Sequence, residues 1–147
     1  IFALLTGPAR GFVKEKLKEN GIPFIHQYPS NHNDLKSLYH ALDIYLITSR
    51  EEGGPMGLLE SAACGTPVVS TNVGMARDLI TDRLTGFIVE RIEAEELSKK
   101  VEFCINLKCD EKIKLQKNAR NAVCKFDWSI IARKHWEEIY KPLIAIK

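Results

Sequence analysis

The hydrophobic and polar positions of this chain follow two alternating periods up to Glu90. Short apolar runs that are typical of buried strands are bounded by Gly, Pro, Asn or Ser. The segments between them carry the spacing of amphipathic helices. The strand candidates are FALLT (residues 2–6), PFIHQ (23–27), DIYLITS (43–49), TPVVST (66–71) and GFIVE (86–90). This rhythm predicts an α/β fold, a Rossmann-like parallel sheet flanked by helices.

Only helical patterns follow Glu90, so we expect the final third to pack against the sheet or against a neighbouring domain. Trp128 and Trp136 lie on one helical stretch and are expected to serve core or interdomain packing. We therefore divide the chain into a domain at residues 1–125 and a C-terminal helix at 126–147. The predicted helices span residues 11–20, 33–42, 55–64, 75–81, 94–107, 110–125 and 129–140.

Composition narrows the class of protein. A chain of 147 residues that is 45% hydrophobic is large enough to bury a core. Its net charge of +2 comes from scattered residues, so a nucleic-acid partner is not expected. No apolar run approaches the roughly 18 residues of a membrane span, and we expect a cytoplasmic protein. The four cysteines show no metal-binding spacing and are expected to be free buried thiols.

Candidate chemistry lies in the segment EEGGPMGLLE at residues 51–60, directly after a predicted strand. Ligands of parallel sheets bind at the carboxyl ends of the strands, where this segment lies. Pro55 suits the first position of a helix, because its missing N–H would be unpaired there anyway. The next amides would then be unpaired at the positive end of the helix dipole and could bind a phosphate or diphosphate. They belong to Met56, Gly57 and Leu58.

Gly53, Gly54 and Gly57 leave space for a ligand to approach this backbone. Glu60 falls in the second helical turn and could bind a sugar diol next to the phosphate, while Glu52 would face the group beyond it. The alternative for both acids is structural, since a carboxylate near a helix N-terminus stabilises the dipole without any ligand.

The whole string resembles the C-terminal, nucleotide-sugar-binding domain of retaining glycosyltransferase family 4, whose enzymes have the GT-B fold of two Rossmann-like domains. The shared features are E-x7-E from Glu52 to Glu60, followed by ACGTPVVST, VGMARDLI and TGFIV. LYHALDIYLITSREEGG upstream and FDW at residues 126–128 also resemble the family. Nearly the whole chain is covered.

The resemblance implies a role for each part of the site. Glu60 would bind ribose hydroxyls, Glu52 would contact the transferred sugar, and the amides from Gly54 to Leu58 would hold the sugar and diphosphate. The base would lie near Tyr28 and Ser30. The metal-binding D-x-D sequence of another glycosyltransferase fold is absent, so no metal or other cofactor is expected.

The chain also departs from the family. Members hold the diphosphate with an Arg and a Lys after the first strand of this domain, and neither that strand nor that segment is present. We expect the absent strand to lie centrally, between FALLT and DIYLITS. Members bind the acceptor with a separate N-terminal domain, which is also absent. We therefore expect a fragment that, when it is expressed alone, is inactive and either poorly soluble or oligomeric.

The sequence thus predicts the donor domain of an enzyme that transfers a sugar from a UDP- or GDP-linked donor to a hydroxyl of a glycan, lipid or other acceptor. The resemblance implies a role in polysaccharide biosynthesis and allows peripheral association with the inner face of a membrane. Two alternatives stay open. One is a non-catalytic nucleotide-binding module, for which Glu52 is dispensable, and the other is a nucleotide-sugar epimerase with catalytic acids outside the Glu52–Glu60 pair.

Overall fold

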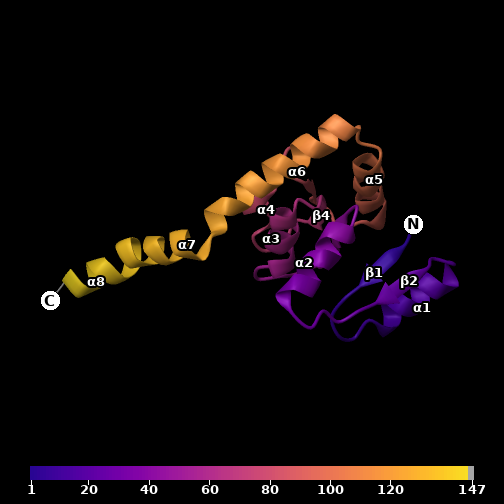
Figure 1. The fold of residues 1–147 in the computed structure, drawn as a ribbon, viewed down its shortest axis with the longest axis horizontal. Coiled ribbons are helices and arrows are strands. Elements are labelled where there is room, and N and C mark those ends of the chain that lie inside the picture. Colours follow the sequence, from indigo (N-terminus) through magenta and orange to yellow (C-terminus); the bar gives the residue numbers. More distant parts are fainter. Residues whose placement is uncertain (146–147) are drawn as a thin grey trace. The chain divides into compact units, whose positions relative to one another are not determined.

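The computed structural model describes residues 1–145 of the chain and contains all five predicted strands, alternating with helices (Figure 1). The strands form parallel sheets flanked by helices, which confirms the predicted α/β class. The chain divides into two compact units, Ile1–Ser37 and Leu38–Lys147. None of the helices among residues 1–145 has both the length and the apolar character that crossing a membrane requires.

The first unit is built on a two-stranded parallel sheet. Strands β1 (Ala3–Leu5) and β2 (Phe24–His26) are connected by helix α1 (Gly11–Glu19). Helix α2 (His32–Ala41) begins in this unit and ends in the second. Its start is capped by Asn31, whose Oδ1 accepts a hydrogen bond of 3.0 Å from the Asp34 amide.

The second unit contains a three-stranded parallel sheet in the order β3-β4-β5. Its strands are β3 (Tyr45–Ile47), β4 (Val68–Thr71) and β5 (Phe87–Val89). Helix α3 (Met56–Cys64) connects the first two strands, and the short helix α4 (Ala76–Leu79) connects the last two. Helices α5 (Ala94–Ile105) and α6 (Cys109–Val123) follow the sheet.

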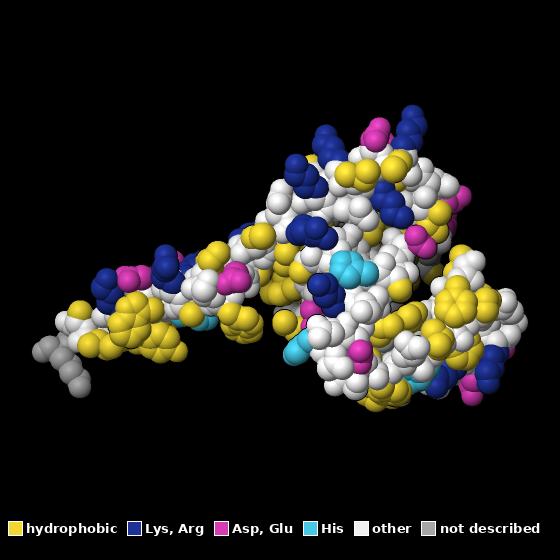
Figure 2. All heavy atoms as spheres, viewed as in Figure 1, with side chains coloured by type: hydrophobic (Ala, Val, Ile, Leu, Met, Phe, Trp, Pro, Cys, Tyr) yellow, Lys and Arg dark blue, Asp and Glu magenta, His cyan; other side chains and the backbone are white. Residues whose placement is uncertain are grey.

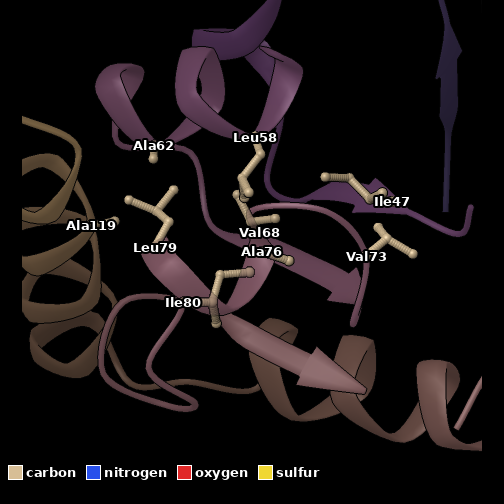
Figure 3. Close-up of a cluster of buried hydrophobic side chains, with 9 residues drawn as sticks. All are labelled: Ile47, Leu58, Ala62, Val68, Val73, Ala76, Leu79, Ile80 and Ala119. Atoms are coloured by element: carbon tan, nitrogen blue, oxygen red, sulfur yellow. The ribbon is translucent and has the colours of Figure 1, made fainter. Parts of the chain in front are cut away.

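Strand β4 is buried on both faces, as expected for a central strand of a covered parallel sheet. Val68 points to one side, into a cluster with Leu58 of α3 and Leu79 of α4 (Figure 3). Val69 points to the other side and packs with Phe87 and other residues. The sheet is therefore held between two apolar layers, which fixes the carboxyl ends of β3 and β4.

The sheet of the first unit and the sheet of the second share no strand pairing in the described chain. Strand β1 pairs with β2, and β3 pairs with β4. A further strand between β1 and β3 stays a prediction.

The C-terminal segment consists of a 3₁₀ turn η1 (Cys124–Phe126), helix α7 (Trp128–His135), a π turn η2 (Trp136–Tyr140) and helix α8 (Lys141–Ala145). Most of its side chains are exposed, with Trp128 at 77% and Trp136 at 50%, and Figure 2 shows apolar side chains on its surface. Core packing of the two tryptophans is therefore wrong, because both side chains are exposed. Interdomain packing stays a prediction.

The cysteines differ in burial. Cys104 is buried and Cys64 is intermediate, whereas Cys109 and Cys124 are exposed. None of these four described residues forms a disulfide, as predicted, but the expectation that all are buried is wrong. Cys109 is the first residue of α6 and Cys124 follows its last turn, and helix ends face solvent more than helix centres do.

Candidate functional site

Helix α3 begins at the carboxyl end of β3 with unpaired amides. Pro55 is the residue before the helix, with φ of −68° and ψ of 101°, so the helix starts one residue later than predicted. Among the described residues, no acceptor pairs with the N–H groups of Met56 and Gly57. The Leu58 N–H already donates to the Pro55 carbonyl at 2.9 Å, so the expectation that it is unpaired is wrong. Two N–H groups at the positive end of the helix can bind an anion.

Helix α3 is held firmly at its other end. Gly65 caps this end, with φ of +75° and an N–H that donates to the Ala62 carbonyl at 3.0 Å. Arg120 of α6 donates from Nε to the Ala63 carbonyl at 3.1 Å and from Nη2 to the Cys64 carbonyl at 3.0 Å. These bonds satisfy carbonyls that a helix leaves unpaired and place a cation at its negative end.

Helix α3 packs on the core through one face. Leu58 and Ala62 are fully buried, and Leu59 packs on the same cluster. Ala63 is exposed, and Ser61 is buried, with its hydroxyl donating to the Leu58 carbonyl at 3.1 Å. A buried hydroxyl is tolerated there because a carbonyl of the helix backbone accepts its hydrogen bond.

Glu52 lies on the exposed loop between β3 and α3, supported by both neighbouring strands. Thr71, at the end of β4, donates its hydroxyl to the Ser49 carbonyl at 2.7 Å. Ser49 in turn donates its own hydroxyl to Glu52 Oε1 at 2.7 Å. The carboxylate is therefore oriented by a residue that the sheet edge fixes, while its other oxygen is outside this contact.

The loop after β4 lies against the backbone of Glu52 and Gly53. Gly74 has φ of +49°, and a Cβ atom there would lie 2.7 Å from the Glu52 carbonyl oxygen and 2.8 Å from that of Gly53. Only glycine permits both this conformation and this approach. The sequence offered one signal for this contact, a glycine just after a strand in the VGMARDLI stretch, but not which backbone it meets.

Glu60 is bound by a buried tyrosine that sequence reasoning did not find. Tyr39 of α2, which is 7% exposed, donates its hydroxyl to Glu60 Oε2 at 2.8 Å. Burial raises the pKa of Tyr39 far above its usual value, and the hydrogen bond to Glu60 raises it further. The phenol therefore keeps its proton at neutral pH and acts as a donor to the carboxylate.

A second tyrosine lies against the first turn of α3. The rings of Tyr39 and Tyr45 meet edge to face, with centroids 5.4 Å apart and an interplanar angle of 74°. A Cβ atom at Gly57 would lie 2.3 Å from the Tyr45 hydroxyl oxygen and 3.1 Å from that of Tyr39. Gly57 therefore gives room to both hydroxyls, in addition to exposing its own amide.

The remaining predicted site residues, Tyr28 and Ser30, follow β2 in the first unit. Tyr28 is 63% exposed, and its ring lies 4.7 Å from that of His26. The Ser30 hydroxyl donates to Asp34 Oδ2 at 2.7 Å and so contributes to the start of α2. The structure therefore gathers the predicted residues of the Glu52–Glu60 segment, and it leaves the contact of Tyr28 and Ser30 with a nucleotide base as a prediction.

No group of three or more His, Cys, Asp or Glu side chains within residues 1–145 is arranged to hold a metal ion. Of the acids in the segment, Glu52 and Glu60 each have one hydrogen-bond donor described above. What the segment offers to a ligand is therefore two carboxylates and a helix N-terminus.

Residues 8–122 match the sequence profile of the family described as glycosyl transferases group 1. The chain belongs to this family. The match includes every residue of the loop and helix described above, so this segment lies within the part of the chain that shows the family.

Curated relatives of the chain are also glycosyltransferases. An α-1,3-N-acetylgalactosaminyltransferase of Campylobacter jejuni, acting on N,N'-diacetylbacillosaminyl-diphospho-undecaprenol by its name, is 29% identical over 110 residues. The match covers 74% of this chain and 28% of that enzyme. The chain thus spans less than a third of that relative's length.

Solved structures of GT-B glycosyltransferases share the fold. A glycosyltransferase from Rickettsia africae has a TM-score of 0.85 and 30% identity, with 98% of this chain and 40% of that chain covered. The Anabaena protein Alr3699/HepE, solved in complex with UDP-glucose, has a TM-score of 0.78 and 25% identity, with 95% and 41% covered. The fold of the described residues is therefore that of part of a GT-B enzyme.

Proposed function

We propose that this chain forms the donor-binding part of a retaining, nucleotide-sugar-dependent glycosyltransferase of family 4. The observation that carries the proposal is the loop and helix from Glu52 to Glu60, where two carboxylates flank the unpaired amides of Met56 and Gly57. A nucleoside diphosphate sugar presents, in order, a diol, a diphosphate and a hexose. Glu60, the amides and Glu52 follow one another in a matching order.

In this proposal Glu60 binds the ribose hydroxyls, since a carboxylate accepts two hydrogen bonds from a diol. The N–H groups of Met56 and Gly57 bind the diphosphate, with the dipole of α3 opposing its negative charge. Glu52 binds hydroxyls of the transferred hexose. The base lies near Tyr28 and Ser30. The Anabaena relative was solved with UDP-glucose, which favours a UDP-linked donor.

The chemistry of the proposal is electrostatic. An acceptor hydroxyl attacks the anomeric carbon, the bond from that carbon to the phosphate oxygen breaks, and the diphosphate departs with the electron pair. The helix N-terminus stabilises the charge that develops on the leaving group. The acceptor attacks from the same face that the phosphate leaves and passes its proton to that phosphate, so the anomeric configuration is retained. No metal ion or other cofactor is required in this scheme.

The acceptor is proposed to be a glycan or lipid hydroxyl held by a second domain, because the chain spans 28% of the Campylobacter relative and 40% of the Rickettsia structure. The basic residues that assist the diphosphate in family members would come from outside these residues too. A cytoplasmic enzyme that associates peripherally with a membrane agrees with a diphospho-undecaprenol acceptor such as the one in the name of the Campylobacter relative.

The test is turnover against affinity at Glu52, in the protein at its natural length. Glu52→Gln should lower kcat severely in a transfer assay with UDP- and GDP-sugars, while the Kd for free UDP or GDP changes little. The reason is that an interaction made at the reacting hexose appears in kcat. Glu51→Gln, a neighbouring exposed acid, is the matched control and should retain turnover. Wild-type turnover in Glu52→Gln would instead favour a non-catalytic nucleotide-binding module.

A further inference from the structure

We propose that Tyr39 is a positioning residue, which holds the Glu60 carboxylate in the orientation that receives the ribose of the donor. This inference rests on the proposed function, because it concerns the carboxylate assigned to the ribose. Tyr39 lies 21 residues before Glu60 and on a different helix, so its effect on a ligand would pass through Glu60.

Tyr39 is itself fixed on several sides. Its side chain is 7% exposed, and its ring packs edge to face on Tyr45. Its backbone carbonyl accepts a hydrogen bond of 2.7 Å from the buried Thr66 hydroxyl, which ties the end of α2 to the turn before β4. A hydroxyl held in this way has little freedom to follow a mobile partner. The Glu60 carboxylate must therefore adopt the orientation that reaches the Tyr39 hydroxyl.

Glu60 is the more adaptable member of the pair. A glutamate side chain has three rotatable bonds and is only partly buried here, so without a donor it could point in several directions. The 2.8 Å bond from Tyr39 to Oε2 selects one of them and leaves Oε1 outside this contact. A diol needs a carboxylate that is already oriented, because freezing it on binding would weaken affinity.

Gly57 allows the arrangement. A side chain at position 57 would collide with the Tyr45 hydroxyl at 2.3 Å and approach that of Tyr39 at 3.1 Å. With glycine there, both tyrosines reach the first turn of α3, where the unpaired amides lie. Gly57 therefore supplies one of the amide donors and also leaves room for the tyrosine that orients Glu60. The parts of the proposed site that bind ribose and diphosphate are thus connected through the first turn of α3.

The experiment compares binding of UDP with 2′-deoxy-UDP, and of GDP with 2′-deoxy-GDP, by calorimetry on the protein at its natural length. The preference for the ribose form reports the contacts of the 2′-hydroxyl, because both nucleotides share base and diphosphate. Wild type should prefer the ribose form by roughly tenfold or more, as expected for a hydrogen bond to a charged group. Glu60→Gln should lose most of this preference.

Tyr39→Phe keeps the ring and removes only the donor, and it should reduce the preference to within about threefold, as expected when the carboxylate is left to choose its own rotamer. In the Glu60→Gln background it should have no further effect, which separates an effect through Glu60 from a general one. Tyr140→Phe, an exposed tyrosine of η2, is the control and should keep the wild-type preference. The ratio of two affinities measured on one preparation does not depend on the fraction of folded protein.

Each outcome decides a different claim. If Tyr39→Phe keeps the full preference while Glu60→Gln loses it, the ribose assignment stands and the positioning role of Tyr39 is wrong. If Tyr39→Phe lowers only the melting temperature, Tyr39 has a structural role alone. If wild type shows no preference for ribose with either nucleotide, the assignment of Glu60 fails, and the inference fails with it.

Discussion

Glu52 and Glu60 are supported by different parts of the molecule, although they lie on one loop and helix. Glu52 depends on Ser49 and on the loop that contains Gly74. Glu60 depends on Tyr39, which is packed inside the second unit. Substitutions near each acid should therefore affect different steps, turnover for the first and nucleotide affinity for the second.

Gly74→Ala tests the support of Glu52. The added Cβ would lie 2.7 Å from the Glu52 carbonyl oxygen, and the loop must move because the atom is backbone. We expect kcat to fall about tenfold or more, as a displacement of about 1 Å can cost a hundredfold. Gly21→Ala is the control, because Gly21 also has positive φ, at +64°, but no atom within 4 Å. Equal turnover in the two variants would contradict the contact.

Gly57→Ala tests the space beside Tyr45. The substitution alone should lower the free energy of unfolding by about 1 to 3 kcal/mol, the usual cost of overpacking, although alanine favours helix. Tyr45→Leu removes the hydroxyl oxygen and the ring carbon that the new Cβ would strike, at 2.3 and 2.8 Å. In a denaturation cycle the double variant should therefore be more stable than the sum of the single effects. Additive effects would argue against the collision.

The residues of the site were predictable to the extent that local sequence determines them. Glu52, Glu60 and the capping Gly65 all lie in one continuous stretch, where helix-end chemistry and the resemblance apply. Tyr39 and Gly74 were not identified, because their contacts join segments that are far apart in sequence. The expectation that the Leu58 amide is unpaired was wrong for a local reason, because a tight first turn pairs this amide with the Pro55 carbonyl.

At the level of elements, the cap that α6 provides to α3 should stabilise the fold. Arg120→Met keeps the length of the side chain but removes the bonds to the Ala63 and Cys64 carbonyls. We expect a loss of about 0.5 to 1.5 kcal/mol in urea denaturation, the usual net worth of such bonds at an exposed site. Lys117→Met on the same helix is the control, since Lys117 is exposed. Equal stability of the two variants would contradict a stabilising role of the Arg120 cap.

The burial of Cys104 in α5 predicts how readily its thiol reacts. Burial raises the pKa of Cys104 from 9.0 to about 11. At pH 8 iodoacetamide should therefore modify the exposed Cys109 and Cys124 well before Cys104, which mass spectrometry can follow. The stability that the protonated thiol contributes is present below pH 9 and is lost as the pH rises towards 11. Equal labelling of all three would show that α5 opens readily.

The elements themselves follow closely from periodicity, because a strand or helix face is specified by neighbouring residues. Helix α3, for example, was expected at residues 55–64 and spans Met56–Cys64. The burial of the C-terminal helices was not predictable in the same way. An apolar stripe with Trp128 and Trp136 predicts packing against another surface but does not specify which surface that is.

At the level of the whole molecule, a helix N-terminus and basic side chains are proposed to balance the charge of the diphosphate, without a metal ion. Transfer activity of the protein at its natural length should therefore survive dialysis against EDTA with less than about a twofold loss. The control is the same preparation with Mg²⁺ or Mn²⁺ restored, which should have the same rate. Activity that disappears in EDTA and returns with the metal would show that a cation balances the diphosphate.

The most direct test of the central claim is the affinity of nucleoside diphosphate when Glu60 is removed. Calorimetry with UDP and GDP should show binding to wild type and a loss of about 1 to 3 kcal/mol in Glu60→Ala, the usual cost of removing a charged hydrogen-bond partner. Glu138→Ala, an acid of η2, should bind as wild type does. Unchanged affinity in Glu60→Ala would contradict the account, because Glu60 would then have no part in holding the donor.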